Sequence, residues 1–104
     1  MMIRFSLEYG GWPVWSIDSG DCDVRFPADI EVPKELNDLL DEIQSEYDEL
    51  FVDNEKEFYY KGFDNEAKKE VFKQKCYMAL AQVIILNDGR YHFENFLSAD
   101  LRNL

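Results

Sequence analysis

The apolar residues between positions 36 and 51 recur every three or four positions, which predicts an amphipathic helix. Its apolar stripe consists of Leu36, Leu39, Leu40, Ile43, Tyr47, Leu50 and Phe51. The opposite, polar face consists of Asp38, Asp41, Glu42, Ser45, Asp48 and Glu49. Pro33 suits the first helical turn because its φ is fixed, and Glu35 is favoured beside the positive helix N-terminus. The helical phase therefore points Leu40, Ile43 and Tyr47 toward the core, and Asp41 and Glu42 toward solvent.

A second helix is predicted to begin near Asp64 or Asn65, because either side chain can cap a helix N-terminus. Its core stripe consists of Phe72, Cys76, Ala79, Leu80 and Val83. Residues 76–86 are apolar on nearly every side, so we expect the second half of this helix to be buried on more than one side. The β-branched run at 83–85 is also compatible with a strand, but it continues the helical period. Residues 87–89, Asn-Asp-Gly, form a stop signal.

Strands are predicted at both ends of the chain. Residues 3–9 alternate between apolar and polar, and residues 91–96 alternate again. Between them, residues 12–17 are expected to form a short edge strand or an ordered loop, because Pro13 has no N–H for a central ladder. Residues 18–29 are acidic and rich in turn formers, and residues 53–63 are interpreted as a linker. Residues 98–104 are expected to form a last short turn of helix.

These elements predict one α+β domain spanning residues 1–104. A small sheet of two or three strands from the chain ends would carry the two main helices on one face. The length suits a single domain, and 46% hydrophobic and 15% aromatic residues favour a packed core over disorder. No apolar run approaches the roughly 20 residues that span a bilayer, and the first residues lack a signal-peptide core. A cytoplasmic location is therefore expected.

The negative charge is concentrated in one part of the chain. Residues 1–64 hold 17 acidic and 5 basic residues, a net of −12, whereas residues 65–104 have a net of +1. Such a field repels nucleic acid and anionic membranes and attracts a basic partner. A solvated helix face is the ordinary interpretation of acidic residues. A net charge of −11 over 104 residues exceeds what solubility requires, however, and like charges on one face destabilise the helix.

A partner-binding face is therefore the candidate functional site. Its carboxylates are Asp38, Asp41, Glu42, Asp48 and Glu49 on the helix, with Asp53, Glu55 and Glu57 as a second cluster. Trp12, Tyr59 and Tyr60 are candidate interface anchors, because Trp and Tyr dominate binding hot spots. Trp12 is as compatible with burial as with partial exposure, whereas Trp15 is expected to fill the core.

No catalytic, cofactor or metal site can be assembled from the sequence. Cys22 is flanked by carboxylates that disfavour a thiolate, and Cys76 lies in an apolar segment, so neither is a promising nucleophile. A Cys22–Cys76 disulfide is not expected in a reducing compartment. Asp18, Asp21 and Asp23 lack the order and the final Glu of a calcium loop. His92, the single histidine, has no assignable catalytic partners. We expect no enzyme and no cofactor.

Three segments carry a resemblance to known proteins: EYGGWPVWS at 8–16, VPKELNDLLDEIQSEYDELF at 32–51, and a late helix followed by a strand. The chain resembles a family of small acidic bacterial proteins that includes immunity proteins of contact-dependent growth inhibition and polymorphic toxin systems. The resemblance implies an immunity protein that binds and neutralises a cognate toxin, and it transfers no catalytic residues. The acidic charge predicts that this toxin is a basic nuclease, because a nuclease must attract phosphate and an acidic inhibitor can mimic that charge. The alternative is an acidic adaptor or subunit of a cytoplasmic complex that has no toxin partner.

Overall fold

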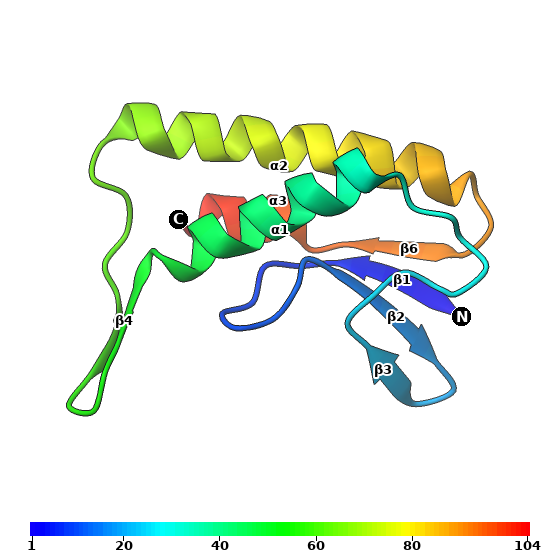
Figure 1. Ribbon diagram of the computed structural model, residues 1–104, viewed down its shortest axis with the longest axis horizontal. Helices are drawn as coiled ribbons and strands as arrows, with labels where there is room; N and C mark the ends of the chain where they lie inside the picture. The colour runs from blue at the N-terminus through cyan, green and yellow to red at the C-terminus, as the bar shows by residue number, and fades with distance from the viewer.

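Six strands and three helices follow one another in the computed structural model, which describes all residues from 1 to 104 (Figure 1). The strands are β1 Met2–Phe5, β2 Val14–Asp18, β3 Asp21–Asp23, β4 Phe51–Asp53, β5 Phe58–Tyr60 and β6 His92–Asn95. The helices are α1 Lys34–Asp48, α2 Glu66–Asn87 and α3 Leu97–Arg102. The predicted α+β class is confirmed.

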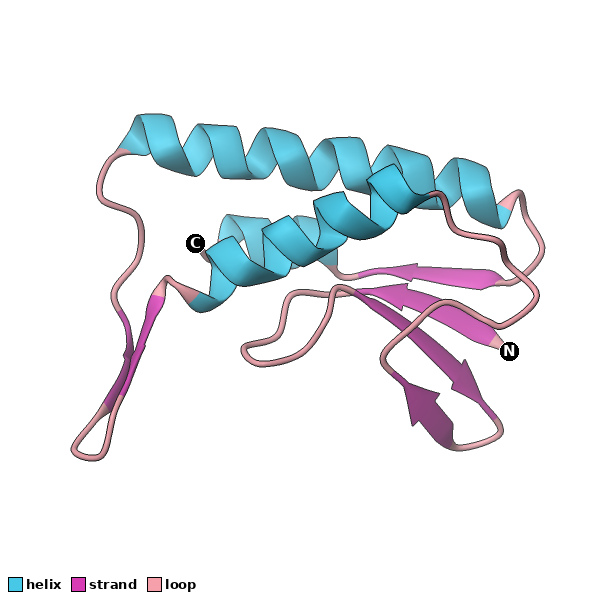
Figure 2. Ribbon diagram, viewed as in Figure 1, coloured by secondary structure: helices cyan, strands magenta, loops and turns pink.

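Strands from both chain ends build the main sheet, in the order β3-β2-β1-β6 (Figure 2). β1 pairs antiparallel with β2 and parallel with β6, so that Ile3 lies opposite Ser16 on one side and Phe93 on the other. The parallel pairing requires the chain to cross over the sheet between β1 and β6. The segment containing α1 and α2 makes this crossover. The sheet is thus mixed and four-stranded.

The core lies between one face of this sheet and the three helices. Ile3, Phe5 and Val14 from the sheet are fully buried, as are Leu40 and Ile43 from α1. α2 contributes Phe72, Cys76, Ala79 and Val83, and α3 contributes Leu97 and Leu101. The predicted phase of α1 is confirmed, because the Leu40 and Ile43 side chains are inaccessible to solvent and Tyr47 packs half-buried against the core.

α2 begins where the sequence predicts, and its cap explains why. The Asn65 side chain accepts a hydrogen bond of 2.9 Å from the Lys68 N–H, which satisfies one of the free donors of the first turn. The helix ends at Asp88, which adopts a left-handed conformation with φ of 48°. Asn and Asp tolerate that conformation better than other residues with side chains. The residues at 87–89 are therefore sufficient to explain why the helix ends here.

Two predictions about strands and linkers are wrong. β2 is an interior strand between β1 and β3, neither an edge strand nor a loop, because Pro13 lies just before it and leaves the ladder intact. Residues 53–63 are not a simple linker, because β4 and β5 form an antiparallel hairpin that projects from the body (Figure 1). Asn54 builds its turn by accepting hydrogen bonds from the N–H groups of Lys56 and Glu57.

Two predictions about burial are also wrong. Trp15 does not fill the core: its neighbours Val14 and Ser16 point inward, so Trp15 lies half-buried on the other face of the sheet, in register with Arg4. The second half of α2 is buried on one side only. Ile84 and Ile85 remain 50% and 76% exposed, because α1 and the sheet cover one face of α2 and nothing covers the opposite face.

Candidate functional site

The carboxylates of α1 divide into those that bond within the chain and those that are free. On one flank, Asp41 accepts a hydrogen bond of 2.8 Å from the Trp12 indole N–H. About two helical turns further on, Asp48 accepts hydrogen bonds from the Gly10 N–H at 2.9 Å and from Gln44 Nε2 at 2.8 Å. The phase of α1 predicts Asp48 on the outer face, but it lies half-buried against the loop between β1 and β2. Asp41 and Asp48 therefore hold this loop on the helix.

The other flank of α1 is bonded to α2. Lys75 Nζ lies 2.8 Å from carboxylate oxygens of both Glu42 and Glu46. The hydrogen bonds that Lys75 donates to these two carboxylates raise its pKa above the ordinary value of 10.5. Asp38 pairs with Lys34 within α1 at 2.9 Å, and both groups are largely exposed. Glu42 is thus partly neutralised in the free protein, and so is Asp38.

The hairpin carries the second acidic cluster and rests on a group of aromatic rings. Phe51 is at the centre of this group, with ring centroids of Tyr9, Tyr47 and Tyr60 between 5.0 and 5.3 Å away and Phe58 stacked at 5.7 Å. The Tyr9 hydroxyl donates a hydrogen bond of 3.0 Å to Asp53, and this bond raises the Tyr9 pKa. The rings fix the base of the hairpin on the body, while its acidic turn extends into solvent.

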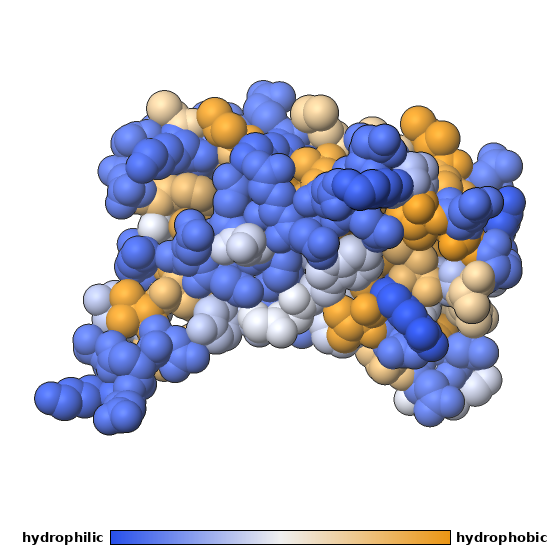
Figure 3. Space-filling model, in the orientation of Figure 1, coloured by the Kyte–Doolittle hydropathy of each residue, from blue (hydrophilic) through white to orange (hydrophobic).

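Three of the eight predicted carboxylates have no partner inside the chain. Glu49 follows the last turn of α1, and Glu55 and Glu57 lie in the hairpin turn; all three are exposed and their side chains form no hydrogen bond or ion pair. We call the area formed by Glu49, Asp53, Glu55 and Glu57, with the exposed rings of Tyr59 and Tyr60, the α1–hairpin surface. Figure 3 shows hydrophilic side chains over α1 and over the end of the hairpin. The structure thus brings the predicted second cluster next to the end of the predicted helix face.

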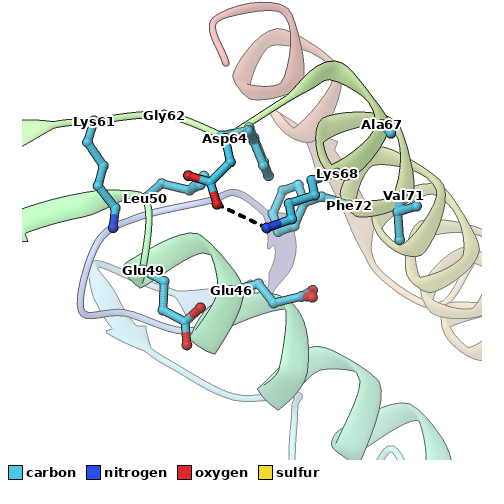
Figure 4. Close-up of a pocket in the computed structure, with 11 residues that line it drawn as sticks. Glu46, Glu49, Leu50, Lys61, Gly62, Asp64, Ala67, Lys68, Val71 and Phe72 are labelled. Atoms are coloured by element: carbon cyan, nitrogen blue, oxygen red, sulfur yellow. Dashed lines mark hydrogen bonds and ion pairs between the residues drawn. The ribbon is translucent and has the colours of Figure 1, made fainter.

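An open cleft of about 500 Å³ lies where α1, the hairpin and the start of α2 meet. Leu50 and Phe72 are among its apolar lining residues. Its charged groups are Glu46, Glu49, Lys61, Asp64 and Lys68. Figure 4 shows Glu46 and Glu49 along the α1 side and the Asp64–Lys68 ion pair across from them. With no Ser, Cys or His in its lining, the cleft suits an amphipathic side chain of a partner better than it suits a reaction.

The reactive side chains are dispersed. His92 is exposed at the start of β6, and Cys22 is exposed in β3. Cys76 is buried in α2, where desolvation raises its pKa to about 12, so its thiol stays protonated. No three or more of the His, Cys, Asp and Glu side chains are grouped as a metal site would require. None of the helices has the length and hydrophobicity needed to cross a membrane.

Comparison with models of protein families shows which family the chain belongs to. A family model described as Serratia CdiI immunity protein-like matches residues 1–85. The chain belongs to this family. The match runs from before β1 to near the end of α2, so it includes α1, the hairpin and the cleft. No curated protein matches the chain, and no solved structure matches it. The resemblance read from the sequence is confirmed, and an immunity function follows from membership of the CdiI immunity protein-like family.

Sequence reasoning missed several residues that shape this immunity protein's surface. Lys75 was not singled out, although a lysine on a second helix is a natural partner for an acidic one. The helical period predicts Phe51 in the α1 stripe, whereas it begins β4 and organises the aromatic group. The run Phe58-Tyr59-Tyr60 after an acidic turn was the available signal, because aromatic residues after a turn-forming Asn indicate a hairpin.

Proposed function

We propose that this chain neutralises a cognate bacterial toxin by binding it through the α1–hairpin surface, and that the toxin is a basic nuclease. The family supports the immunity function, and the charge distribution supports the chemistry of the partner. A nuclease must attract phosphate groups, so its substrate groove presents positive charge. An acidic protein can occupy that groove by offering carboxylates in place of phosphates.

The free carboxylates are the observation that carries the location of this surface. Glu49, Glu55 and Glu57 have no partner in the chain, so a basic side chain can pair with them without breaking an existing bond. Asp41 and Asp48 would have to give up hydrogen bonds to Trp12, Gly10 and Gln44. We therefore infer that the end of α1 and the hairpin contribute more to binding than the middle of the helix.

Aromatic side chains beside these carboxylates would supply the apolar part of the contact. Tyr59 is 47% exposed and Tyr60 is 40% exposed, on a hairpin that projects from the body. Tyrosine buries a large apolar area and has a hydroxyl for hydrogen bonding, which is why it is frequent in hot spots. Trp12 is half-buried and its indole N–H is already bonded to Asp41, so we expect it to contribute less than the two tyrosines.

Inhibition in this proposal needs binding alone. We expect the chain to act in the cytoplasm, with no enzymatic activity, no cofactor and no metal, and to bind neither nucleic acid nor membrane. Covering the toxin's substrate groove excludes nucleic acid sterically and electrostatically. The acidic adaptor that the sequence leaves open has less support, because the family is one of immunity proteins.

Producing the toxin domain encoded beside this gene in bacterial cells, with and without the chain, tests the proposal. We expect growth arrest without the chain, normal growth with it, and co-purification of the two proteins. Nuclease assays on the purified domain, with the chain added in increasing amounts, would then show loss of cleavage at a fixed stoichiometry. If the chain neither binds the toxin nor protects the cells, the adaptor alternative gains support.

A further inference from the structure

α2 exposes an apolar face that the fold leaves uncovered. Val71, Tyr77, Met78, Ile84 and Ile85 are between 49% and 76% exposed, and we call them the α2 outer face. They lie on the opposite side of the helix from the buried residues Phe72, Cys76, Ala79 and Val83. Figure 3 shows hydrophobic side chains at the surface along the edge where α2 runs. Grouped exposed apolar residues of this size indicate a contact surface.

The spacing of these residues suits another helix. Val71, Met78 and Ile85 are seven positions apart, and Tyr77 and Ile84 repeat the same interval beside them. Val71, Met78 and Ile85 thus repeat at one heptad position, and Tyr77 and Ile84 repeat at the position before it, while polar Gln74 and small Ala81 lie between them on the same side of the helix. A seven-residue apolar repeat is the pattern by which two helices pack along their length.

The charges of α2 argue against the basic toxin as the occupant. The helix contains four lysines and two glutamates, a net of +2, whereas residues 1–64 have a net of −12. A basic partner is therefore attracted to the acidic half of the chain more strongly than to α2. Two copies of this chain repel each other most through their acidic halves, and this repulsion is smallest when they meet through α2, where Lys68 and Lys75 are already paired with carboxylates of the same chain.

We propose that two copies of this chain pair antiparallel through the α2 outer face, with a two-fold axis near Met78. This axis places Val71 of one copy opposite Ile85 of the other. The antiparallel direction also brings the lysine-rich first half of each helix near the partner's helix C-terminus. That end has no basic residue in its last turn and is followed by Asp88, so positive charge there is favourable.

The pair leaves the proposed toxin surface free. The α1–hairpin surface is not part of the α2 outer face, and the cleft beside it shares only Val71 with that face, so each copy could still bind one toxin through the hairpin. The contact from Val71 to Ile85 extends about 21 Å along the helix, which buries less than the roughly 800 Å² per partner of a standard interface. We therefore expect a reversible dimer with a dissociation constant on the order of micromolar.

Sedimentation of the purified chain between about 1 µM and about 1 mM tests the pairing. We expect a shift from monomer to dimer over this range for the unmodified protein. Ile85→Lys should weaken the dimer about tenfold or more, while Val24→Lys, the same kind of change at an exposed site directly after β3, should not. Thermal melts of both variants show that they fold. A protein that stays monomeric throughout, or two variants with equal dimerisation, would overturn the proposal.

Cross-linking tests the direction of the pair. In a Cys22→Ser background, Met78→Cys should form a disulfide with the same residue of the second copy, because residue 78 of each copy lies at the two-fold axis. Val71→Cys and Ile85→Cys should cross-link only when the two variants are mixed. Self-cross-linking of Val71→Cys alone would contradict the antiparallel arrangement. If Ile85→Lys instead abolished toxin binding by a monomeric chain, the α2 outer face would belong to the toxin and not to a second copy.

Discussion

Trp12 and Asp41, which are 29 positions apart, are joined by a hydrogen bond of 2.8 Å from the indole N–H to the carboxylate. Both residues are predicted from the sequence to contact a partner, yet the structure first makes them contact each other. Together with the bonds of Asp48 to Gly10 and Gln44, this contact anchors the loop between β1 and β2 on α1. Charge reversal at Asp41 and Asp48 would therefore disturb the fold as well as any binding.

Truncation of Leu40 should be among the most destabilising changes in α1. Leu40 is fully buried between the sheet and the helices, so Leu40→Ala removes buried methyl groups and leaves a cavity. We expect a loss of about 2–4 kcal/mol in the free energy of unfolding, measured by urea denaturation. Leu39→Ala, at a half-buried neighbouring position, should cost clearly less. Equal costs would mean that α1 is rotated about its axis.

Loss of the Asp48 carboxylate should cost stability, whereas loss of Glu49 should not. Asp48→Ala removes the acceptor of the Gly10 N–H and one of the two acceptors of the Gln44 amide, which also donates to the Glu8 carbonyl, so we expect a cost of about 1 kcal/mol. Glu49→Ala is the matched control, since that side chain has no internal partner. Urea denaturation of both variants distinguishes the two roles. Similar stabilities would contradict a structural role for Asp48.

Alkaline pH should weaken the link between α1 and α2. Because Glu42 and Glu46 raise the pKa of Lys75 above 10.5, its ion pairs are fully formed below that pH and are lost as the pH rises through the folded-state pKa. Lys75→Gln should therefore lower stability by up to about 1 kcal/mol at neutral pH, and this difference should shrink above pH 10.5. A difference that does not change with pH would show that the loss comes from packing.

The two cysteines should differ sharply in reactivity. Cys22 is exposed, whereas Cys76 is buried with a pKa of about 12. A thiol reagent at neutral pH should label one site in the native protein and two in denaturant, because the thiolate is the reactive form. Mass spectrometry after brief labelling identifies the site. Rapid native labelling of Cys76 would mean that α2 opens readily.

Local and periodic signals made most of the fold predictable. The spacing of Leu36, Leu40 and Ile43 fixes the buried side of α1, and Asn65 fixes the start of α2, because both depend on residues within one or two turns. The last strand and the short C-terminal helix were found for the same reason.

The wrong predictions concern burial and strand position, which depend on contacts between segments far apart in the sequence. The apolar run at the end of α2 is equally compatible with full burial and with a helix whose outer side is uncovered, and Ile85 shows that the second holds. The position of β2 inside the sheet depends on β3, a strand of three residues within the segment 18–29, which is rich in turn formers. The candidate site was predictable as an acidic region. Which carboxylates are free was not, because the partners of Asp41 and Glu42 come from distant segments.

The most direct measurement of the central proposal is the rate at which the chain associates with its toxin domain at two salt concentrations. Glu49→Lys with Glu57→Lys changes two free carboxylates on the α1–hairpin surface, and Asp21→Lys with Glu31→Lys makes the same change in net charge at two exposed positions outside it. Steering acts over about 8–10 Å at physiological ionic strength, so the first variant should associate much more slowly and with a weaker salt dependence. The second should stay close to the unmodified protein. Equal rates for the two variants would contradict binding through this surface.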